Sequence, residues 1–387
     1  TLFRSLGHVA KPGRHVLWTC HRQELATQAA GTLRAVGLRV RYVGDDIPDQ
    51  DDADAQVTVA MLQTLQQRGV RPDATMCLQD ECHHLSGNTW ADVFDHYRDL
   101  PRVGLTATPE RGAGKGLDGL YDDLVVVCQP RDLITQGYLV PCEVLSPAER
   151  LETHQLAQGV IPAYRTHAQG KRTIVFYARV SDAEQGAKDF SLAGIPAECV
   201  HGETSDRTGT IARFKSGETQ VLTNVFVFTE GFDVPAVECI ILARGCGTTG
   251  TWLQIAGRAL RPHPGKTSAL VIDLRGVVND HGMPTDDREY SLTGRAIRTV
   301  DQEARHCKVC SAVIEEYPCD SCGYDPEKPT AAETVIVDVA LQKFSQKRAE
   351  PDAAEIPEHR VRHLPRPRGL SGDSAALGCA ECDQSLL

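Results

Sequence analysis

Residues 75–83 read Thr-Met-Cys-Leu-Gln-Asp-Glu-Cys-His, a short apolar strand followed by two adjacent carboxylates, Asp80 and Glu81. A carboxylate at the carboxyl end of a parallel strand lies where α/β sheets bind ligands. One Asp can hold Mg²⁺, usually through water, while a neighbouring Glu polarises an attacking water. The alternative is a solvated acidic turn, and Gln79 is more polar than the end of such a strand usually is. The surrounding sequence has to decide between the two interpretations.

Strand-like and helix-like segments alternate on both sides of this stretch. In the first half, strand patterns cover residues 15–19, 38–43, 56–60, 74–78 and 103–106, and helix patterns cover 23–36 and 61–68. In a second series, which starts near residue 140, strand patterns cover 173–177, 198–200, 220–223, 239–243 and 268–272, and helix patterns cover 181–193, 207–215 and 251–260. Because the connections are short, the sequence predicts two α/β domains with parallel sheets, joined near residues 130–142.

The composition is that of a globular protein. Of the 387 residues, 41% are hydrophobic and 24% charged, which excludes wholesale disorder. No run approaches a membrane-spanning length and the first residues lack a signal-peptide pattern, so we expect no membrane partner. The net charge of -11 excludes a histone-like coat of positive charge, but not nucleic-acid binding in a local groove. The 14 cysteines indicate a reducing, cytoplasmic environment with some cysteines as metal ligands.

Two further motifs change the interpretation of the acidic pair. One is Gly104 to Pro109, about twenty residues further on, and the other is Gln254 to Arg261. On a helix, Gln254, Arg258 and Arg261 lie at i, i+4 and i+7, so one face projects an amide and two guanidinium groups. Such a face suits charge stabilisation on a transferring phosphoryl group. An exposed basic helix face is the alternative.

Together these motifs resemble those of the superfamily 2 helicases of the DEAD/DEAH type, in the right order along residues 10–285. The matching segments are Val16 to Leu25 (motif Ia), Asp80 to His83 (motif II), Thr106 to Thr108 (motif III), Thr173 to Tyr177 (motif IV), Thr223-Asn224 with Thr229 to Pro235 (motif V) and Gln254 to Arg261 (motif VI). The forms of motifs V and VI and a Cys-rich module near the C-terminus are most similar to RadD-like bacterial and phage helicases. The resemblance implies two tandem RecA-like domains with an ATP site between them.

The resemblance also implies roles for residues of the first domain. Asp80 would coordinate Mg²⁺, and Glu81 would position the attacking water. His83 would couple the nucleotide site to the other domain, and Thr106 and Thr108 would link hydrolysis to domain movement.

In the second domain, the resemblance implies nucleotide contacts from two motifs. Arg258 and Arg261 would reach the γ-phosphate, and Gln254 would order them. Gly231 and Asp233 would line the nucleotide site.

Four residues would lie on the nucleic-acid face and contact phosphates: Arg22, Gln63, Thr64 and Thr223. For Thr64 and Thr223 the alternative is a role as helix-cap and strand residues.

One part of the family pattern, the Gly-rich loop that ends in Gly-Lys-Ser/Thr, is not found where a first domain needs it. Gly112 to Gly116 has Gly after the lysine, and Gly265-Lys266-Thr267 follows motif VI, so we reject both segments as phosphate loops. In the family this loop precedes motif Ia by a short helix, and residues 1–6 read as that helix. We therefore expect the loop to lie upstream of Thr1, and we expect the chain as given not to hydrolyse ATP.

Four cysteines, Cys307, Cys310, Cys319 and Cys322, form two C-x₂-C pairs separated by eight residues. Four thiolates in two close pairs suit tetrahedral Zn²⁺, so we expect a zinc ribbon; unligated thiols are the alternative. A further pair, Cys379 and Cys382, is interpreted as free thiols, with half of a second metal site as the alternative.

We therefore expect four regions: an incomplete RecA-like domain at 1–138, a second RecA-like domain at 139–285, a zinc ribbon at 286–330 and a flexible tail at 331–387. The tail includes an arginine-rich stretch, residues 360–368, that could follow a phosphate backbone. The predicted function is ATP-dependent helicase or translocase activity on nucleic acid, with DNA favoured over RNA and with ATP, Mg²⁺ and Zn²⁺ as cofactors. Two alternatives stay open: a zinc-containing nucleic-acid-binding protein without ATPase activity, and the motor subunit of a restriction complex.

Overall fold

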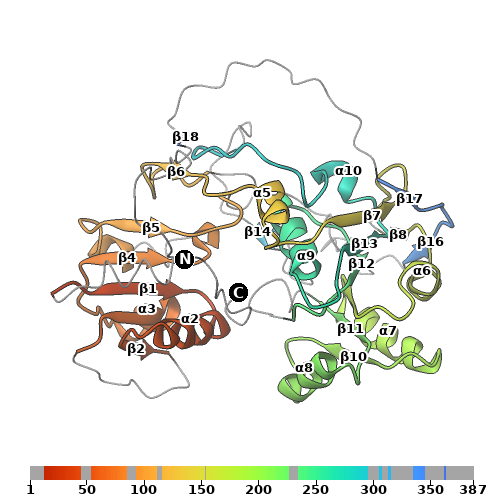
Figure 1. Ribbon diagram of the computed structural model, residues 1–387, viewed down its shortest axis with the longest axis horizontal. Coiled ribbons are helices and arrows are strands. Elements are labelled where there is room, and N and C mark those ends of the chain that lie inside the picture. Colours follow the sequence, from red (N-terminus) through yellow and green to blue (C-terminus); the bar gives the residue numbers. More distant parts are fainter. Residues whose placement is uncertain are drawn as a thin grey trace, which may run out of the picture. The chain divides into compact units, whose positions relative to one another are not determined.

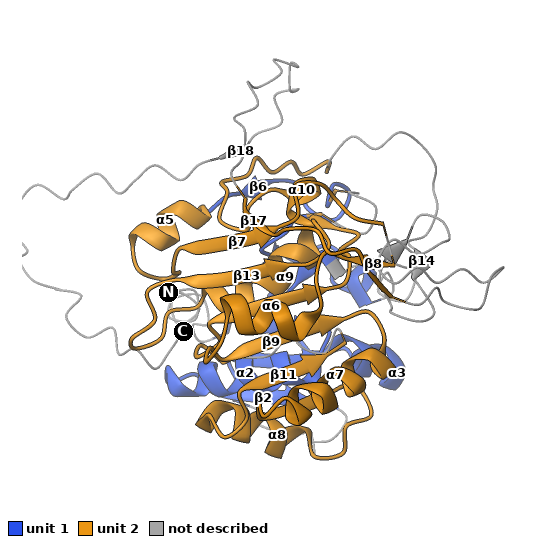
Figure 2. Cartoon of the chain, turned by 90° about the vertical axis from the view of Figure 1, so that its right-hand side faces the viewer, with its two compact units in different colours: residues 1–109, 117–127, 359–387 blue, residues 110–116, 128–358 orange. Residues whose placement is uncertain are grey.

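A computed structural model describes residues 13–44, 54–84, 93–110, 116–152, 154–225, 234–294, 305–306, 313–314, 334–344 and 361–362. The chain divides into two compact units (Figure 2). The first consists of Thr1–Pro109, Leu117–Val127 and His359–Leu387, and the second of Glu110–Gly116 and Cys128–Glu358. Each is described by itself. Within the described residues, no helix is both long enough and apolar enough to cross a membrane.

Unit 1 is built on a five-stranded sheet in the order β2-β3-β1-β4-β5, in which every neighbouring pair is parallel (Figure 1). Its strands are β1 (Val16–Cys20), β2 (Val40–Val43), β3 (Val57–Met61), β4 (Met76–Gln79) and β5 (Arg102–Gly104). Every residue of β1 and β3 is buried, as expected of inner parallel strands covered on both faces.

Two helices of unit 1 follow strands directly: α2 (Gln23–Ala35) follows β1, and α3 (Leu62–Arg68) follows β3. The buried face of α2 is mostly alanine and packs against β1, β2 and β3. A short strand, β6 (Leu124–Val125), pairs in parallel with β18 (Val361–Arg362), and the 3₁₀ turn η1 (Cys82–His84) follows β4.

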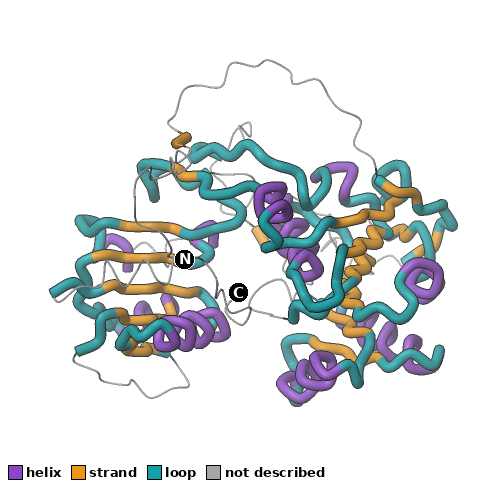
Figure 3. The backbone as a smooth tube through the Cα atoms, viewed as in Figure 1, coloured by secondary structure: helices purple, strands orange, loops and turns teal. Residues whose placement is uncertain are grey.

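Unit 2 contains a seven-stranded sheet in the order β10-β11-β9-β12-β13-β7-β17, parallel except for its last pair. Its strands are β7 (Cys142–Ser146), β9 (Thr173–Tyr177), β10 (Ala197–Val200), β11 (Val221–Asn224), β12 (Cys239–Ala243), β13 (Ala269–Asp273) and β17 (Gln342–Lys343). The helices of this unit are α5 (Pro130–Thr135), α6 (Val160–His167), α7 (Val180–Leu192), α8 (Arg207–Ser216), α9 (Thr249–Leu260) and α10 (Val278–His281), seen in Figure 3. Four short strands form two further pairs in this unit: β8 (Gln155–Leu156) with β16 (Val335–Ile336), and β14 (Arg305–His306) with β15 (Val313–Ile314).

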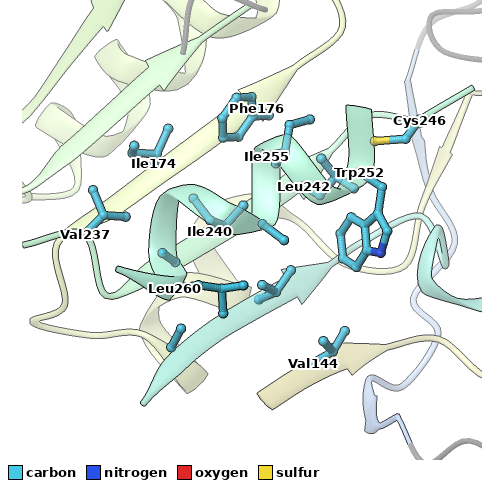
Figure 4. Packing of buried hydrophobic residues seen from close by; sticks show 14 of the residues in the cluster. Val144, Ile174, Phe176, Val237, Ile240, Leu242, Cys246, Trp252, Ile255 and Leu260 are labelled. Carbon is cyan, nitrogen blue, oxygen red and sulfur yellow. The ribbon is translucent and has the colours of Figure 1, made fainter. Parts of the chain in front are cut away.

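Both faces of the unit 2 sheet are buried. Successive residues of a strand point to opposite faces, so neighbouring residues of β9 belong to different clusters. Ile174 and Phe176 of β9 pack in a cluster with Trp252 and Ile255 of α9 (Figure 4). Val175, between them, packs on the other side with residues of α6 and α7. The motif VI helix therefore rests on the sheet through its apolar face.

The ten strands and five helices expected from the sequence are all present, with ends shifted by at most two residues. The prediction of a flexible tail does not hold for residues 334–344. There β16 pairs with β8, β17 pairs with β7, and Leu341 and Phe344 pack against the core of unit 2. The tail as a whole is rich in Pro, Ala and charge, and this average composition obscures the apolar residues concentrated between Val335 and Phe344.

Candidate functional site

The carboxyl ends of four strands in unit 1 form one polar edge. Thr19 of β1 is in register with Ala60 of β3 and with Gln79 of β4, and Gln79 is in register with Gly104 of β5. The residues that directly follow these strands therefore share one edge of the sheet. They include four predicted site residues: half-buried Arg22, exposed Gln63, half-buried Asp80 and half-buried Thr106.

The acidic pair lies in a constrained turn. The Asp80 amide donates to the carbonyl of Thr19, and Oδ1 of Asp80 accepts the amide of Glu81 at 3.1 Å. Glu81 has a φ of 49°, in the left-handed region that residues other than glycine rarely adopt. Backbone hydrogen bonds from Cys82 to Leu105 and from Leu105 to Gln79 then tie the loop after β4 to the loop after β5. Such constrained backbone is typical of functional sites.

Side chains connect the same two loops. Nδ1 of His83 lies 2.9 Å from Oγ1 of Thr106 and 3.4 Å from Oε2 of Glu81. Oγ1 of Thr106 donates to the carbonyl of Thr108 and accepts the amide of Thr108. Since the hydroxyl proton is directed to that carbonyl, the contact with His83 requires Nδ1 to carry the proton, and this tautomer also suits the nearby carboxylate. The structure thus brings together Glu81, His83, Thr106 and Thr108.

Gln79, the polar residue at the end of β4, has a partner that the sequence did not indicate. Its side chain is buried, and Oε1 accepts a hydrogen bond from the Tyr121 hydroxyl at 2.9 Å. Burial raises the pKa of Tyr121, so the phenol stays protonated and keeps donating. Gly104 makes room for this ring, because a Cβ there would lie 2.5 Å from Cζ of Tyr121. The only sequence signal was the unexplained polarity of Gln79.

In unit 2, helix α9 carries the predicted arginine face. The Thr248 side chain caps its first turn by accepting the Thr251 amide, and Trp252 is fully buried. Arg258 is 9% exposed, and Gln254 is half-buried. The helix ends at Leu260, and Arg261 follows it with a ψ of 137°. The expectation that Arg261 lies on the helix at i+7 is therefore wrong. Pro262 explains this difference, because a residue that precedes proline is driven out of the helical region.

Two predicted nucleic-acid contacts are buried. Thr64 of α3 and Thr223 of β11 have no exposed surface, and Oγ1 of Thr223 donates to the carbonyl of Ala183 at 2.6 Å. These positions fit the alternative interpretation as residues that stabilise their own domain.

Six predicted site residues, Gly231, Asp233, Cys307, Cys310, Cys319 and Cys322, lie outside the described residues, as do Cys379 and Cys382. Within the described part of the chain, no group of three or more His, Cys, Asp or Glu side chains could hold a metal ion.

Two family models match the chain. The one described as "Type III restriction enzyme, res subunit" matches residues 2–111, and "Helicase conserved C-terminal domain" matches residues 153–263. The "51.5 kDa protein" of a Lactococcus phage (isolate 7-9) is 27% identical over 367 residues, covering 87% of this chain and 78% of that protein. IRC3 of Saccharomyces cerevisiae, a candidate ATP-dependent helicase, is 29% identical over 295 residues, covering 66% of this chain and 42% of that protein. These two domains and the helicase relatives support a superfamily 2 helicase.

Solved structures agree with the fold of a superfamily 2 helicase. The ATP-dependent Type ISP restriction-modification enzyme LlaBIII bound to DNA is 15% identical, with a TM-score of 0.50 over 70% of this chain and 25% of that chain. Saccharomyces cerevisiae Dbp5 bound to RNA and ADP BeF3 is also 15% identical, with a TM-score of 0.53 over 74% of this chain and 80% of that chain. At this identity the likeness shows a mixed α/β fold with parallel, RecA-like sheets.

Proposed function

We propose that the chain is the motor region of an ATP-dependent helicase or translocase. The observation that carries the proposal is the connection from Glu81 through His83 to Thr106 and Thr108. It links a carboxylate pair at the ligand-binding edge of a parallel sheet to the loop after the neighbouring strand. A motor needs such a link, because the occupancy of the nucleotide site must change the position of other segments.

The residues of unit 1 fit the chemistry of phosphoryl transfer. The half-buried carboxylate of Asp80 suits Mg²⁺, which binds to proteins through one or two carboxylates and several waters. When bound, the ion would neutralise charge on the nucleotide phosphates. Glu81 would orient the attacking water, and the protonated Nδ1 of His83 would hold its carboxylate in place. We assign the stabilisation of transition-state charge to Arg258 and Arg261, with Gln254, Gly231 and Asp233 as the neighbouring nucleotide contacts.

We favour DNA over RNA as the nucleic acid on which the motor acts. The match to the res subunit of a restriction enzyme and the likeness to a restriction-modification enzyme bound to DNA support this choice. The same two findings favour a second candidate function, the motor of a restriction complex. We also keep the RadD-like grouping as a proposal, supported by the form of motifs V and VI in residues 229–235 and 254–261. We assign the phosphate contacts to Arg22 and Gln63, which share the edge with Asp80.

We further propose that Cys307, Cys310, Cys319 and Cys322 bind one Zn²⁺. The antiparallel pair of β14 and β15, with Arg305 opposite Ile314 and His306 opposite Val313, supports this, because the two strands bracket the first C-x₂-C pair. We propose a cytoplasmic location as well. All eight cysteines in the described part of the chain are free thiols, which fits a reducing environment.

The test is steady-state ATP turnover by the protein expressed from its full natural reading frame. We expect single-stranded DNA to stimulate turnover more than single-stranded RNA does. Glu81→Gln should lower kcat by about 10²-fold or more while ATP still binds, because it removes a group that orients or activates water. The matched control is Asp99→Asn, at an exposed carboxylate of the same unit. A wild-type protein that binds nucleic acid but shows no turnover would refute the motor and favour the zinc-containing binding protein.

A further inference from the structure

The Gly265-Lys266-Thr267 segment, rejected above as a phosphate loop, forms a turn just after motif VI. The Lys266 amide donates to the carbonyl of His263 at 2.9 Å, which closes a four-residue turn. Pro264 occupies its second position, and Gly265, with φ of 81°, occupies its third. This is the pattern of a type II turn, which requires a positive φ at the third position and favours Pro before it. The turn explains why Gly precedes Lys here.

The turn directs the Lys266 side chain back toward the end of α9. Its ammonium group donates to three backbone carbonyls: that of Arg261 at 2.8 Å, that of Val237 at 2.5 Å and that of Pro235 at 3.2 Å. A lysine ammonium has three donors and no acceptor, so three carbonyls satisfy it. Burial lowers the pKa of Lys266 to about 8, partly opposed by the nearby Glu238 carboxylate.

These three carbonyls belong to two functional segments. Arg261 is the last residue of motif VI. Pro235 is the last residue of motif V, and Val237 lies two residues beyond it; residues 229–233 of the motif lie outside the described part of the chain. The ammonium group also lies at the C-terminal end of a helix, where cations are favoured and carbonyls lack partners within the helix. A second external donor, the Val140 amide, binds the carbonyl of Leu260 at 2.9 Å. The end of α9 is thus anchored at two successive carbonyls.

We propose that Lys266 is a positioning residue that fixes the peptide group after Arg261, and through it the direction of the Arg261 side chain, relative to the end of motif V. The proposal rests on the assignment of Arg261 to the nucleotide phosphates. Arg261 lies outside the helix, so helical hydrogen bonding does not fix its ψ angle. Pro262 keeps Arg261 out of the helical region, and the contact from Lys266 to the Arg261 carbonyl fixes the direction of that peptide group further. Small displacements of a charge-stabilising group cost turnover much more than they cost ground-state binding.

A double-mutant cycle tests the proposal in the protein expressed from its full natural reading frame. Lys266→Met should lower kcat for ATP about tenfold or more and change KM less than about twofold, because the loss falls on a transition-state interaction. In an Arg261→Ala background the same substitution should lower kcat less than about twofold further, since Lys266 acts through Arg261. Lys266→Arg keeps the charge and several donors and should recover part of the loss. Lys188→Met, at an exposed lysine of α7, is the control.

Thermal unfolding of each variant separates positioning from stability. If Lys266→Met does not fold, Lys266→Arg and Lys266→Gln replace it in the same double-mutant cycle. A lowered midpoint with unchanged kcat, or an equal loss of kcat in both backgrounds, overturns the proposal. Failure of the proposed function is a different result, because Arg261→Ala alone would then leave turnover intact.

Discussion

His83 contacts Thr106 across 2.9 Å from Nδ1 to Oγ1, and the same nitrogen lies 3.4 Å from the carboxylate of Glu81. His83 follows β4, and Thr106 follows β5. The ends of two neighbouring strands are therefore connected by side chains as well as by the backbone bonds of Cys82 and Leu105. If Glu81 moves when its binding partner changes, the contact through His83 can shift the loop at residues 106–108.

Replacing Thr106 with Val tests this connection. Thr106→Val keeps the shape of the side chain but removes the partner of His83 and the hydrogen bonds with Thr108. We expect stimulation of ATP turnover by nucleic acid to fall about 5- to 50-fold, the scale of a typical coupling between sites, with a smaller effect on basal turnover. Turnover measured with and without single-stranded DNA gives this ratio. Thr32→Val, which removes a hydroxyl that donates to the carbonyl of Gln28 within α2, should leave the ratio unchanged. An unaltered ratio in Thr106→Val would contradict the connection.

The arginines of motif VI should affect chemistry more than binding. We expect Arg261→Ala to lower nucleic-acid-stimulated turnover about 10³-fold, the usual scale for an arginine finger, and to weaken ATP binding much less. Arg258→Ala should act similarly, and because Arg258 is almost fully buried, it should also lower the thermal midpoint. Turnover and nucleotide affinity are measured side by side, with Arg165→Ala at an exposed position of α6 as control. Near-normal turnover in both variants would mean that this helix face has no catalytic role.

Sequence patterns were sufficient for the unit 1 sheet, for the place of the acidic pair and for five strands of the unit 2 sheet, but they missed β7 and β17. Inner parallel strands such as β1 and β9 are buried on both faces, so they read as continuous apolar runs of predictable length. Asp80 directly follows one such run, which placed it at the carboxyl edge. The helix end at residue 260 was also predicted, but Arg261 was still placed on the helix face; Pro262, which excludes Arg261 from the helix, was the overlooked signal.

Contacts between distant segments could not be read from sequence. Tyr121 satisfies Gln79 from 42 residues away, and Lys266 binds the carbonyl of Pro235 from 31 residues away. The periodicity of hydrophobic residues within one segment does not indicate which distant residue each side chain contacts. The hydrogen bond from Thr223 to the carbonyl of Ala183 is another such contact. A threonine in a strand can face either side of the sheet, so the sequence left its role open. Sequence reasoning thus failed on contact partners and on elements such as β7, α6 and β17.

The paired cysteines predict a metal content that can be measured directly. Protein purified without chelators should contain one Zn²⁺ per chain, because Cys307, Cys310, Cys319 and Cys322 supply a full tetrahedral set. Elemental analysis gives the ratio. Cys310→Ser should lower it, and Cys379→Ser, outside the paired set, should not. Zinc-free wild-type protein would exclude the ribbon.

Asp273, the last residue of β13, has a buried carboxylate that organises the turn after the strand. Oδ1 accepts the amide of Arg275 at 3.0 Å, and Oδ2 accepts the amide of Val278 at 2.8 Å. Its side chain is fully buried, and burial raises its pKa from 3.8 to about 6, although these hydrogen bonds and the Arg275 charge oppose the shift. Each oxygen thus has its own backbone partner at the start of α10.

Asp273→Asn should therefore destabilise the protein in a pH-dependent way. An amide has one acceptor oxygen, so one of the two backbone donors loses its partner, at a cost of about 1–3 kcal/mol. Because the pKa is higher in the folded state than in the unfolded state, the folded wild type binds more protons between about pH 4 and pH 6, and its stability from this group decreases as pH rises through that window. Asn does not titrate, so the gap between wild type and variant should be largest near pH 4 and should narrow to a constant value above pH 6. Urea midpoints across this range measure the gap. The control is Asp189→Asn, at a carboxylate whose Oδ1 accepts the side-chain amide of Gln185 on α7. A gap that widens toward pH 7 would show that Asp273 is ionised more easily when folded than its burial implies.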